Sequence, residues 1–381
     1  VNSIKGVSAS TAALTINNTD GTCTANLSNR QNRNLIINGA FQVAQRGTSS
    51  TSNGYQTVDR FLIFYDNTDE APTQEQADVA AGTSPYTSGF RKSFKITNGN
   101  QTGGAGTSDV IVFSTKLEAQ DIANSGWNYT SSSSFITLSF WVKSSVAQTF
   151  YGQLVTDDGT KQNYPFETGS LTADTWTKVT KTIPGNSNLT FNNDTGEGME
   201  MIFALFRGTD TTGSISLNAW AANNNSVRMP NNTSTWYTTN DSTFEITAIQ
   251  LEVGSVATDF EHRSFEDEIR RCRRYFCKYV GPLNINFVNE HPNNTAGYLH
   301  FPFYEEMRAS PTVTMGSSVN ISRPQVSVSQ KIQSAADIGP NCFNVIGWSG
   351  QGSLGSTGDA YYRMSLSEGD ANSTISCSAE L

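Results

Sequence analysis

The feature that most constrains the fold is a series of short segments in which large apolar residues alternate with polar ones. The clearest is residues 136–143, where the even positions hold Ile, Leu, Phe and Val and the odd positions hold Thr, Ser, Trp and Lys. A period of two predicts a strand with one buried face, and it puts Trp141 on the face away from the core. Asn-Gly, Asp-Gly and Pro-Gly turn sequences separate further apolar runs. The pattern predicts an all-β sandwich.

Composition and charge exclude several other classes of protein. Aromatic residues make up 10% of the 381 residues, whereas disordered chains have few of them. The net charge is −9, and nucleic-acid binders usually carry a basic excess. No apolar run approaches the roughly 18 residues that a membrane-spanning helix needs, and no signal-peptide pattern opens the sequence. We therefore expect neither nucleic acid as a partner nor membrane insertion.

The cysteines are few and scattered. They are Cys23, Cys272, Cys277, Cys342 and Cys377. An odd, widely spaced set in a chain of this length does not form a disulfide scaffold, and the only close pair fits no common zinc spacing. We expect reduced thiols and folding in a reducing cytoplasm.

The chain divides into four segments. Residues 1–34 are polar and have few large apolar side chains, so we interpret them as an arm that attaches the protein to another protein. Residues 35–262 carry the strand-rich sandwich, and residues 263–281 are predicted to form a linker helix. Residues 282–381 contain further short apolar runs and are predicted to form a small β domain.

The helix prediction rests on capping and on an apolar stripe. Ser264 is a favourable N-cap, acidic residues follow in the first turn, and basic residues come after them, as the helix dipole favours. The stripe contains Ile269, Cys272, Tyr275, Phe276 and Tyr279. Because it is wider than one small domain needs to cover, we predict that these residues form the interface of a homotrimer.

Several motifs resemble, in the same order, those of bacteriophage tail-fibre and virion-appendage proteins. The opening is Asn34-Leu-Ile-Ile-Asn-Gly-Ala-Phe-Gln-Val-Ala-Gln-Arg46, followed by Gln56-Thr-Val-Asp-Arg-Phe61. Leu138-Ser-Phe-Trp-Val-Lys143 and Thr175-Trp-Thr-Lys-Val-Thr180 are similar to strands of the carbohydrate-binding-module jelly roll in that family. Phe260-Glu-His-Arg263 resembles the exit from that jelly roll.

The resemblance implies a jelly-roll sandwich, trimeric assembly and a role at the host surface. It predicts a virion protein, assembled in the cytoplasm of the bacterial host, that acts as a short tail fibre and binds a host surface glycan. Residues 1–34 would then contact other tail or capsid proteins of the phage. Two alternatives stay open: a capsid or tail decoration or adaptor protein with a purely structural role, and a glycan depolymerase.

Glycan binding requires an aromatic face for the sugar ring and polar neighbours for its hydroxyl groups. Five aromatic residues are candidates for this role: Trp220, Trp236, Tyr237, Trp348 and Tyr361. The first three lie in polar stretches of the sandwich segment. Trp348 lies in the Gly-rich loop 347–358 and Tyr361 follows it. We favour this tip over the sandwich candidates because distal loops reach a cell first.

The sequence contains no recognisable catalytic constellation. The nucleophile-elbow, zinc-protease and phosphate-loop motifs are missing, and we interpret His262, in the exit motif, as structural. We therefore predict no enzymatic activity, no catalytic residue and no cofactor. A structural calcium ion is compatible with the acidic loop 66–70, although its spacing is not that of an EF-hand.

Overall fold

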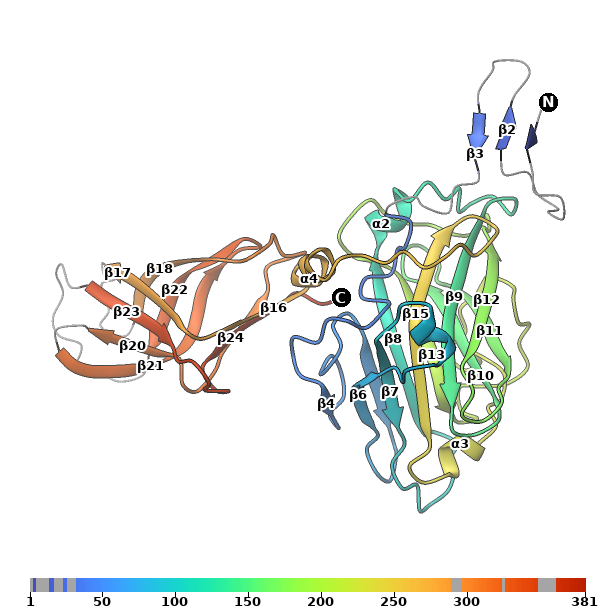
Figure 1. Cartoon of the computed structure of the whole chain (residues 1–381), viewed down its shortest axis with the longest axis horizontal. Coiled ribbons are helices and arrows are strands. Elements are labelled where there is room, and N and C mark those ends of the chain that lie inside the picture. The colour runs from blue at the N-terminus through green and yellow to red at the C-terminus, as the bar shows by residue number, and fades with distance from the viewer. Residues whose placement is uncertain are drawn as a thin grey trace.

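The structure, a computed structural model, describes residues 3–4, 14–16, 23–25, 32–288, 296–323, 326–348 and 361–381. It consists of a large β sandwich, a smaller elongated β domain that projects from it, and a short helix where the two meet (Figure 1). The prediction of an all-β fold with a jelly-roll sandwich, a short linker helix and a second β domain is confirmed. Among the described residues, no helix has the length and apolarity required to cross a membrane.

The sandwich is built from two six-stranded antiparallel sheets, which we call the β13 sheet and the β9 sheet. In spatial order the β13 sheet contains β14 (Ala221–Ala222), β11 (Gln162–Ser170), β10 (Thr149–Thr156), β13 (Glu197–Arg207), β8 (Val110–Glu118) and β5 (Leu62–Asp66). The β9 sheet contains β12 (Thr177–Pro184), β9 (Phe135–Ser144), β15 (Thr243–Val253), β7 (Lys92–Thr97), β6 (Thr73–Asp78) and β4 (Ser49–Ser50). Three short helices connect strands: α1 (Ser84–Thr87), α2 (Ala119–Ala123) and α3 (Thr235–Thr238).

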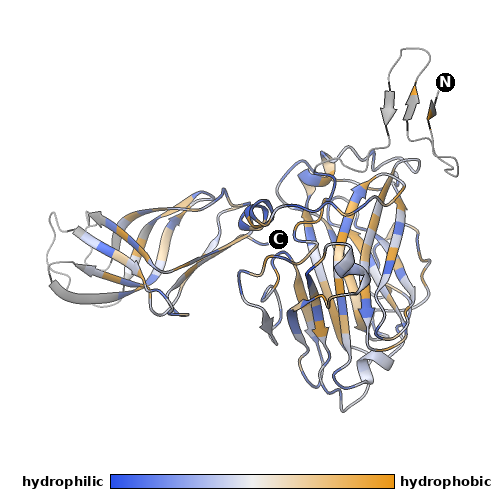
Figure 2. Ribbon diagram, viewed as in Figure 1, coloured by the Kyte–Doolittle hydropathy of each residue, from blue (hydrophilic) through white to orange (hydrophobic). Residues whose placement is uncertain are grey.

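Strand β9 shows how the alternating pattern produces the sandwich. Its even residues from 136 to 142 are fully buried. On the other face Thr137 and Ser139 are also buried, whereas Trp141 and Lys143 are half-buried. The strand pairs with β12 on one side and with β15 on the other, so it lies inside the sheet. Apolar and polar residues alternate along many of the sandwich strands (Figure 2). The apolar faces of the two sheets therefore meet in one core.

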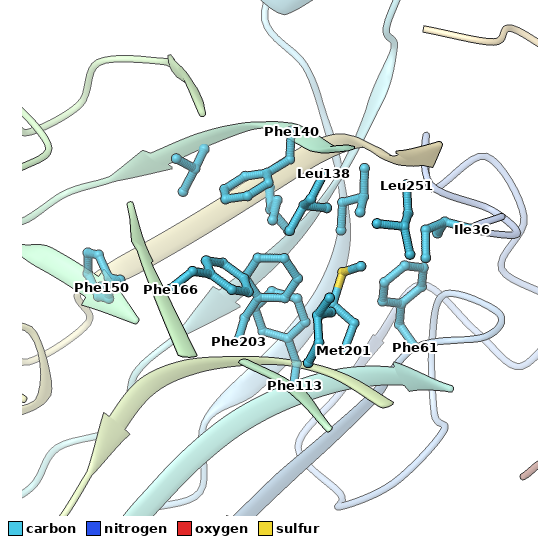
Figure 3. Close-up of a cluster of buried hydrophobic side chains, with 14 of the residues drawn as sticks. Ile36, Phe61, Phe113, Leu138, Phe140, Phe150, Phe166, Met201, Phe203 and Leu251 are labelled. Atoms are coloured by element: carbon cyan, nitrogen blue, oxygen red, sulfur yellow. The ribbon is translucent and has the colours of Figure 1, made fainter. Parts of the chain in front are cut away.

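Aromatic rings from both sheets fill this core (Figure 3). Phe113 and Phe203, on adjacent strands of the β13 sheet, stack with ring centroids 4.9 Å apart. Phe140 of the β9 sheet meets Phe203 edge to face at 5.2 Å. Full burial of one such side chain contributes about 1.5–3 kcal/mol of stability, so the contacts between the sheets are a main source of the fold's stability.

The opening motif fastens the start of the sandwich to β15. The Asn34 side chain donates to the Ile249 carbonyl at 3.1 Å and accepts from the Leu251 amide at 3.0 Å. Gly39 packs so closely on β15 that a Cβ atom there would lie 2.1 Å from the Ile249 carbonyl oxygen. These contacts explain why the segment needs asparagine and glycine at these two positions.

Three short strands are described near the N-terminus. They are β1 (Ser3–Ile4), β2 (Leu14–Ile16) and β3 (Cys23–Ala25), and they form a small antiparallel sheet in that order. The role of residues 1–34 as an attachment arm stays a prediction.

The linker helix is shorter than the sequence suggests. Helix α4 (Phe265–Arg273) begins as expected, with the Ser264 side chain accepting a hydrogen bond from the Asp267 amide at 3.1 Å. The predicted end at residue 281 is wrong, because residues 276–280 form strand β16 (Phe276–Val280) and pair with β24 (Thr374–Ser378). Phe, Cys, Tyr and Val in this run favour a strand once a partner strand is available.

The small domain contains two further sheets. One has three strands, in the order β16, β24 and β19 (Thr312–Met315). The other has six, in the order β17 (Leu283–Val288), β23 (Tyr361–Leu366), β20 (Asn320–Arg323), β21 (Val326–Ile338), β22 (Cys342–Trp348) and β18 (Ala296–Pro302). Side chains from both sheets, among them Tyr279, Phe301 and Met364, share a separate apolar core. The first and last strands of the domain thus lie together beside the sandwich (Figure 1).

The junction between the two domains is held by buried charged and aromatic groups. The Arg60 side chain is 2% exposed and lies over the Tyr275 ring, with its guanidinium carbon 3.4 Å from the ring centroid. It forms an ion pair with Glu380 and donates to the Lys116 carbonyl at 2.6 Å. Residues near both ends of the small domain therefore close around one arginine of the sandwich.

A second cluster at the junction is centred on Glu118. Its carboxylate accepts two hydrogen bonds from Arg274, at 2.8 and 2.9 Å, and one from the Tyr275 hydroxyl at 2.6 Å. Burial raises the pKa of Glu118, but the hydrogen bonds from Arg274 and Tyr275 outweigh burial and hold its pKa below the usual value. The carboxylate is therefore charged, and it orients the chain directly after α4.

This junction overturns the proposed trimer stripe. Four of the five residues are buried against the chain itself, with exposed fractions of 0% for Cys272, 1% for Tyr275, 6% for Phe276 and 4% for Tyr279, and Ile269 is half-buried. The stripe is wide because it has two neighbours within the chain, the sandwich and the small domain. The four buried side chains are not available to another subunit, and a homotrimer stays a prediction that requires other residues.

Candidate functional site

Two of the candidate ligand-binding residues belong to the core of the sandwich. Trp236 is 0% exposed and Tyr237 is 1% exposed. The Trp236 indole donates to the Thr243 carbonyl at 3.1 Å, and the Tyr237 ring stacks on Phe206 with centroids 4.2 Å apart. Short helix α3 turns both rings inward to close one end of the sandwich, so neither presents a face to a sugar.

Trp220 also has a structural role. Its ring packs against the core, with its centroid 5.2 Å from that of Tyr164, and its indole donates to the Pro184 carbonyl at 2.7 Å. The residue is half-buried. Its contacts join the start of β14 to the edge of the sandwich. These contacts use one face and the polar edge of the ring.

The tip candidates fall at the edge of what the structure describes. The backbone of Trp348 ends β22 opposite Ile332, and the backbone of Tyr361 begins β23 opposite Val288. Their side chains and residues 349–360 lie outside the described residues. A binding role for this tip stays a prediction.

Two carboxylates of the acidic loop 66–70 accept hydrogen bonds from backbone amides of the chain. The Asp69 carboxylate accepts from the Gly103 amide at 2.6 Å, and the Glu70 carboxylate accepts from the Asn100 amide at 2.7 Å. Within the described part of the chain, no group of three or more His, Cys, Asp or Glu side chains is arranged to hold a metal ion. The loop acids thus join two neighbouring loops of the sandwich.

A groove of about 380 Å³ lies on the outer face of the β9 sheet, away from the core. Its lining comes from β9, β12 and β15, from residues 88–90 before β7, and from residues 258–262 of the exit motif. These segments are far apart in sequence, and the antiparallel sheet brings them together. The groove is therefore a product of the fold rather than of one motif.

Trp141 is the largest side chain of the groove. It stands opposite Lys178 of β12 and opposite Thr247 of β15, and directly opposed residues share one face of a sheet. The ring is half-buried and packs against Ala248 and Phe260 in a small apolar cluster outside the main core. This arrangement follows from the alternation along β9, which turns Phe140 inward and Trp141 outward.

Three more rings line the groove. Phe90 meets Phe260 edge to face, with centroids 4.9 Å apart, and His262 lies 4.9 Å from Phe90 and 5.1 Å from Phe260. The His262 ring is exposed, and its Nε2 atom is 3.2 Å from the Ser88 carbonyl oxygen. The rings support one another, so their positions do not depend on a ligand.

A β-bulge shapes the part of the groove next to Trp141. The pairing of β15 with β9 shifts between Thr247 and Gln250, and Ala248 within the shift has a left-handed backbone with φ of 58°. A bulge re-aims the side chains of its strand. Here it presents the small Ala248 side chain to the groove, where a larger residue would fill the space.

Positively charged, negatively charged and neutral polar side chains lie beside the rings of the groove. Lys178 and Asp259 are exposed, and the Ser139 hydroxyl-bearing side chain lies on the same outer face as Trp141. Within the described ranges, neither Lys178 nor the Asp259 carboxylate takes part in an ion pair. Lys178 and Asp259 can therefore exchange hydrogen bonds with a polar ligand without losing an ion-pair partner among the described residues.

A second tryptophan stands beside the groove. Trp176 precedes β12 and is half-buried, and the Lys143 ammonium lies 5.3 Å from its ring centroid. Continuing the β12–β9 register places Trp176 opposite Lys143, which makes it a diagonal neighbour of Trp141 on the outer face. The sheet thus carries two tryptophans in a row next to exposed polar side chains.

No family model matches the sequence, and no curated protein matches it. Among solved structures, an enzymatically active domain of a bacteriophage CBA120 tailspike protein is 9% identical, aligns over 58% of this chain and 21% of that chain, and has a TM-score of 0.30. A Bacteroides thetaiotaomicron protein, for which sugar binding has been suggested, is 12% identical over 58% of this chain and all of the other, with a TM-score of 0.30. A family 11 carbohydrate-binding module from Clostridium thermocellum is 11% identical over 56% of this chain and 98% of the module, with a TM-score of 0.25.

The chain spans about a fifth of the tailspike domain with which it aligns. With TM-scores of 0.30 or lower, these likenesses carry no argument about what the chain binds.

Proposed function

We propose that this chain is a non-enzymatic glycan-binding protein and that the groove on the outer face of the β9 sheet is its binding site. The observation that carries the proposal is the combination, in one groove of about 380 Å³, of a half-buried Trp141 with exposed Lys178 and Asp259 side chains that form no ion pair within the described part of the chain. The apolar face of a sugar ring can stack on the indole, while its hydroxyl groups exchange hydrogen bonds with the charged side chains.

The polar lining favours binding over hydrolysis. Glycosidases use two carboxyl groups on opposite sides of the bond that is cleaved, roughly 5–10 Å apart. Asp259 supplies the one carboxylate among the described residues that line the groove. With a lysine near this carboxylate, the groove carries balanced charge and suits an uncharged or weakly charged glycan.

The wider part of the proposal is that the chain is a phage virion protein, a short tail fibre that binds the host cell surface. The motifs that resemble tail-fibre proteins support it, and the opening motif has a structural role here through the contacts of Asn34 and Gly39 with β15. Attachment through residues 1–34 and assembly as a homotrimer are part of this proposal.

An array of bacterial surface glycans, probed with the purified full chain, tests the binding function. We expect selective binding to a small group of glycans, and binding to cells that display them. Cleavage of the bound glycan, measured as new reducing ends, would replace the binding proposal with a depolymerase. Absence of binding to both the array and host cells would contradict the proposal and favour a structural decoration protein.

A further inference from the structure

Two cysteines face each other across the first and last strands of the small domain. Cys277 of β16 is the direct partner of Cys377 of β24 in the antiparallel register. Both are buried, with exposed fractions of 1% and 0%, and both are free thiols. They lie 100 positions apart in sequence, and only the closure of the domain brings them together.

The local strand geometry suits a disulfide. The Ala379 amide donates to the Tyr275 carbonyl at 2.7 Å, which identifies that pair, and by alternation the cysteine pair two residues further on, as hydrogen-bonded positions. Cα atoms in such pairs are about 5.5 Å apart, and disulfides span Cα distances of roughly 4.4–6.8 Å. The Cα separation expected for this pair is therefore compatible with a disulfide.

The two thiols already interact. A hydrogen bond with Cys377 lowers the pKa of Cys277 and outweighs the effect of its burial, and the same bond raises the pKa of Cys377. Cys277 is thus the thiol that becomes a thiolate more readily, and the thiolate is the form that attacks a disulfide.

We propose that Cys277 and Cys377 form a cross-strand disulfide when the protein passes from a reducing to an oxidising environment. The bond would join the strand that enters the small domain to the strand that leaves it. It would enclose the whole six-stranded sheet in a covalent loop, and a bond that closes a long loop restricts the unfolded chain strongly. This inference does not depend on glycan binding.

The oxidant would be a small-molecule disulfide. The Cys277 thiolate attacks one sulfur of this disulfide, forms a mixed disulfide and releases one small thiolate. The Cys377 thiol then loses its proton to solvent, attacks Cys277 and releases the second small thiolate, so that two protein thiols are oxidised and one disulfide is reduced to two thiols. Because β16 is an edge strand of its sheet, fraying of this strand gives the oxidant access.

Two further cysteines, Cys272 and Cys342, serve as internal controls. Cys272 is buried at the junction, where burial raises its pKa well above the ordinary value. Cys342 is half-buried, and its register partner across the strand pair is Pro302. Neither stands opposite a second cysteine among the described strand pairs.

The test incubates the reduced full chain with oxidised glutathione and maps its peptides without reduction. We expect one dominant cross-linked peptide pair, containing Cys277 and Cys377, and a rise of about 5 °C or more in the Tm of the small domain. Cys377→Ser should lose both the cross-link and the rise, and Cys342→Ser should keep both. Two free thiols at these positions in the oxidised wild-type chain, or a different dominant pair, would overturn the proposal without involving a variant that fails to fold.

Discussion

The junction and the groove are built from the same kinds of residue, yet they differ in what surrounds them. At the junction the Arg46 guanidinium lies 3.6 Å from the Phe276 ring centroid and 3.1 Å from a Glu380 oxygen, and both partners are buried. In the groove Trp141 is half-buried beside the exposed charges of Lys178 and Asp259. At the junction, partners within the chain surround the charged and aromatic side chains. In the groove, the charged side chains face solvent.

Hydration distinguishes a structural cluster of aromatic and charged side chains from one that can bind a ligand. Taking a charge out of water costs several kcal/mol unless partners replace the water. The Arg60 and Glu380 pair meets this cost with one another and with Tyr275, so their loss should affect folding. The groove charges are still hydrated, so they can interact with a ligand at a smaller cost.

Replacing Glu380 by alanine should give the largest effect. It leaves Arg60 buried without its carboxylate, and breaking a buried ion pair in this way costs about 3–5 kcal/mol. In urea unfolding of the full chain, the free energy of unfolding of the first transition should fall by that amount. The matched control is Glu306→Ala at an exposed glutamate. If both changes lowered the free energy of unfolding equally, Glu380 would be no more important for folding than a surface residue.

The pH dependence of stability should reveal a second junction residue. Burial raises the pKa of Asp59 to about 6, although the charge of Arg46 opposes this change. A carboxyl whose folded pKa lies above its unfolded value of about 3.9 stabilises the fold fully below that value, and the contribution is lost as the pH rises to about 6. The loss should reach at most about 3 kcal/mol.

Asp59→Asn should remove this part of the pH dependence, since asparagine does not titrate. Tm measured between about pH 4 and 7 should fall less with rising pH in the variant than in the wild-type chain. Asp210→Asn, at an exposed position, should leave the wild-type slope unchanged. A variant with the wild-type slope would show that Asp59 is already charged in the folded protein.

The concentration of salt should have the smallest effect, and it tests how much charge contributes to binding in the groove. Lys178 and Asp259 carry opposite charges and are exposed. Screening by salt therefore weakens two small contributions to the binding affinity that have opposite signs. We expect the affinity for a neutral glycan to change by less than about twofold between about 0.05 and 0.5 M salt. A steep fall in affinity would indicate that charge, rather than stacking, dominates recognition.

Local alternation was sufficient to predict the sandwich and the outward side of Trp141. The period of two in residues 136–143 fixes which side chains share a face, and this property does not depend on distant contacts. The groove itself was not predicted, because Phe90, Lys178 and Phe260 come from distant segments whose neighbours follow from the strand order. His262 was interpreted as structural, and its exposed ring at the groove could not be read from the exit motif alone.

The incorrect predictions share a physical cause. Trp236 and Tyr237 lie in a polar stretch, but helix α3 directs their rings into the core, and their burial is decided by tertiary packing. Residues 276–280 are compatible with an apolar helix stripe and with a strand, and pairing with β24 selects the strand. Local sequence describes the surface that an element offers, whereas its neighbours decide whether that surface is covered.

Titration calorimetry with Trp141→Ala tests the central claim most directly. The ligand is a glycan selected on the array, and the matched control is Trp220→Ala, which removes a half-buried tryptophan with structural contacts. We expect Trp141→Ala to weaken binding by at least about tenfold and Trp141→Phe to restore part of the affinity. Trp220→Ala should keep the wild-type affinity in the fraction of protein that is folded. Wild-type affinity in a folded Trp141→Ala protein would contradict the claim that this groove binds the glycan.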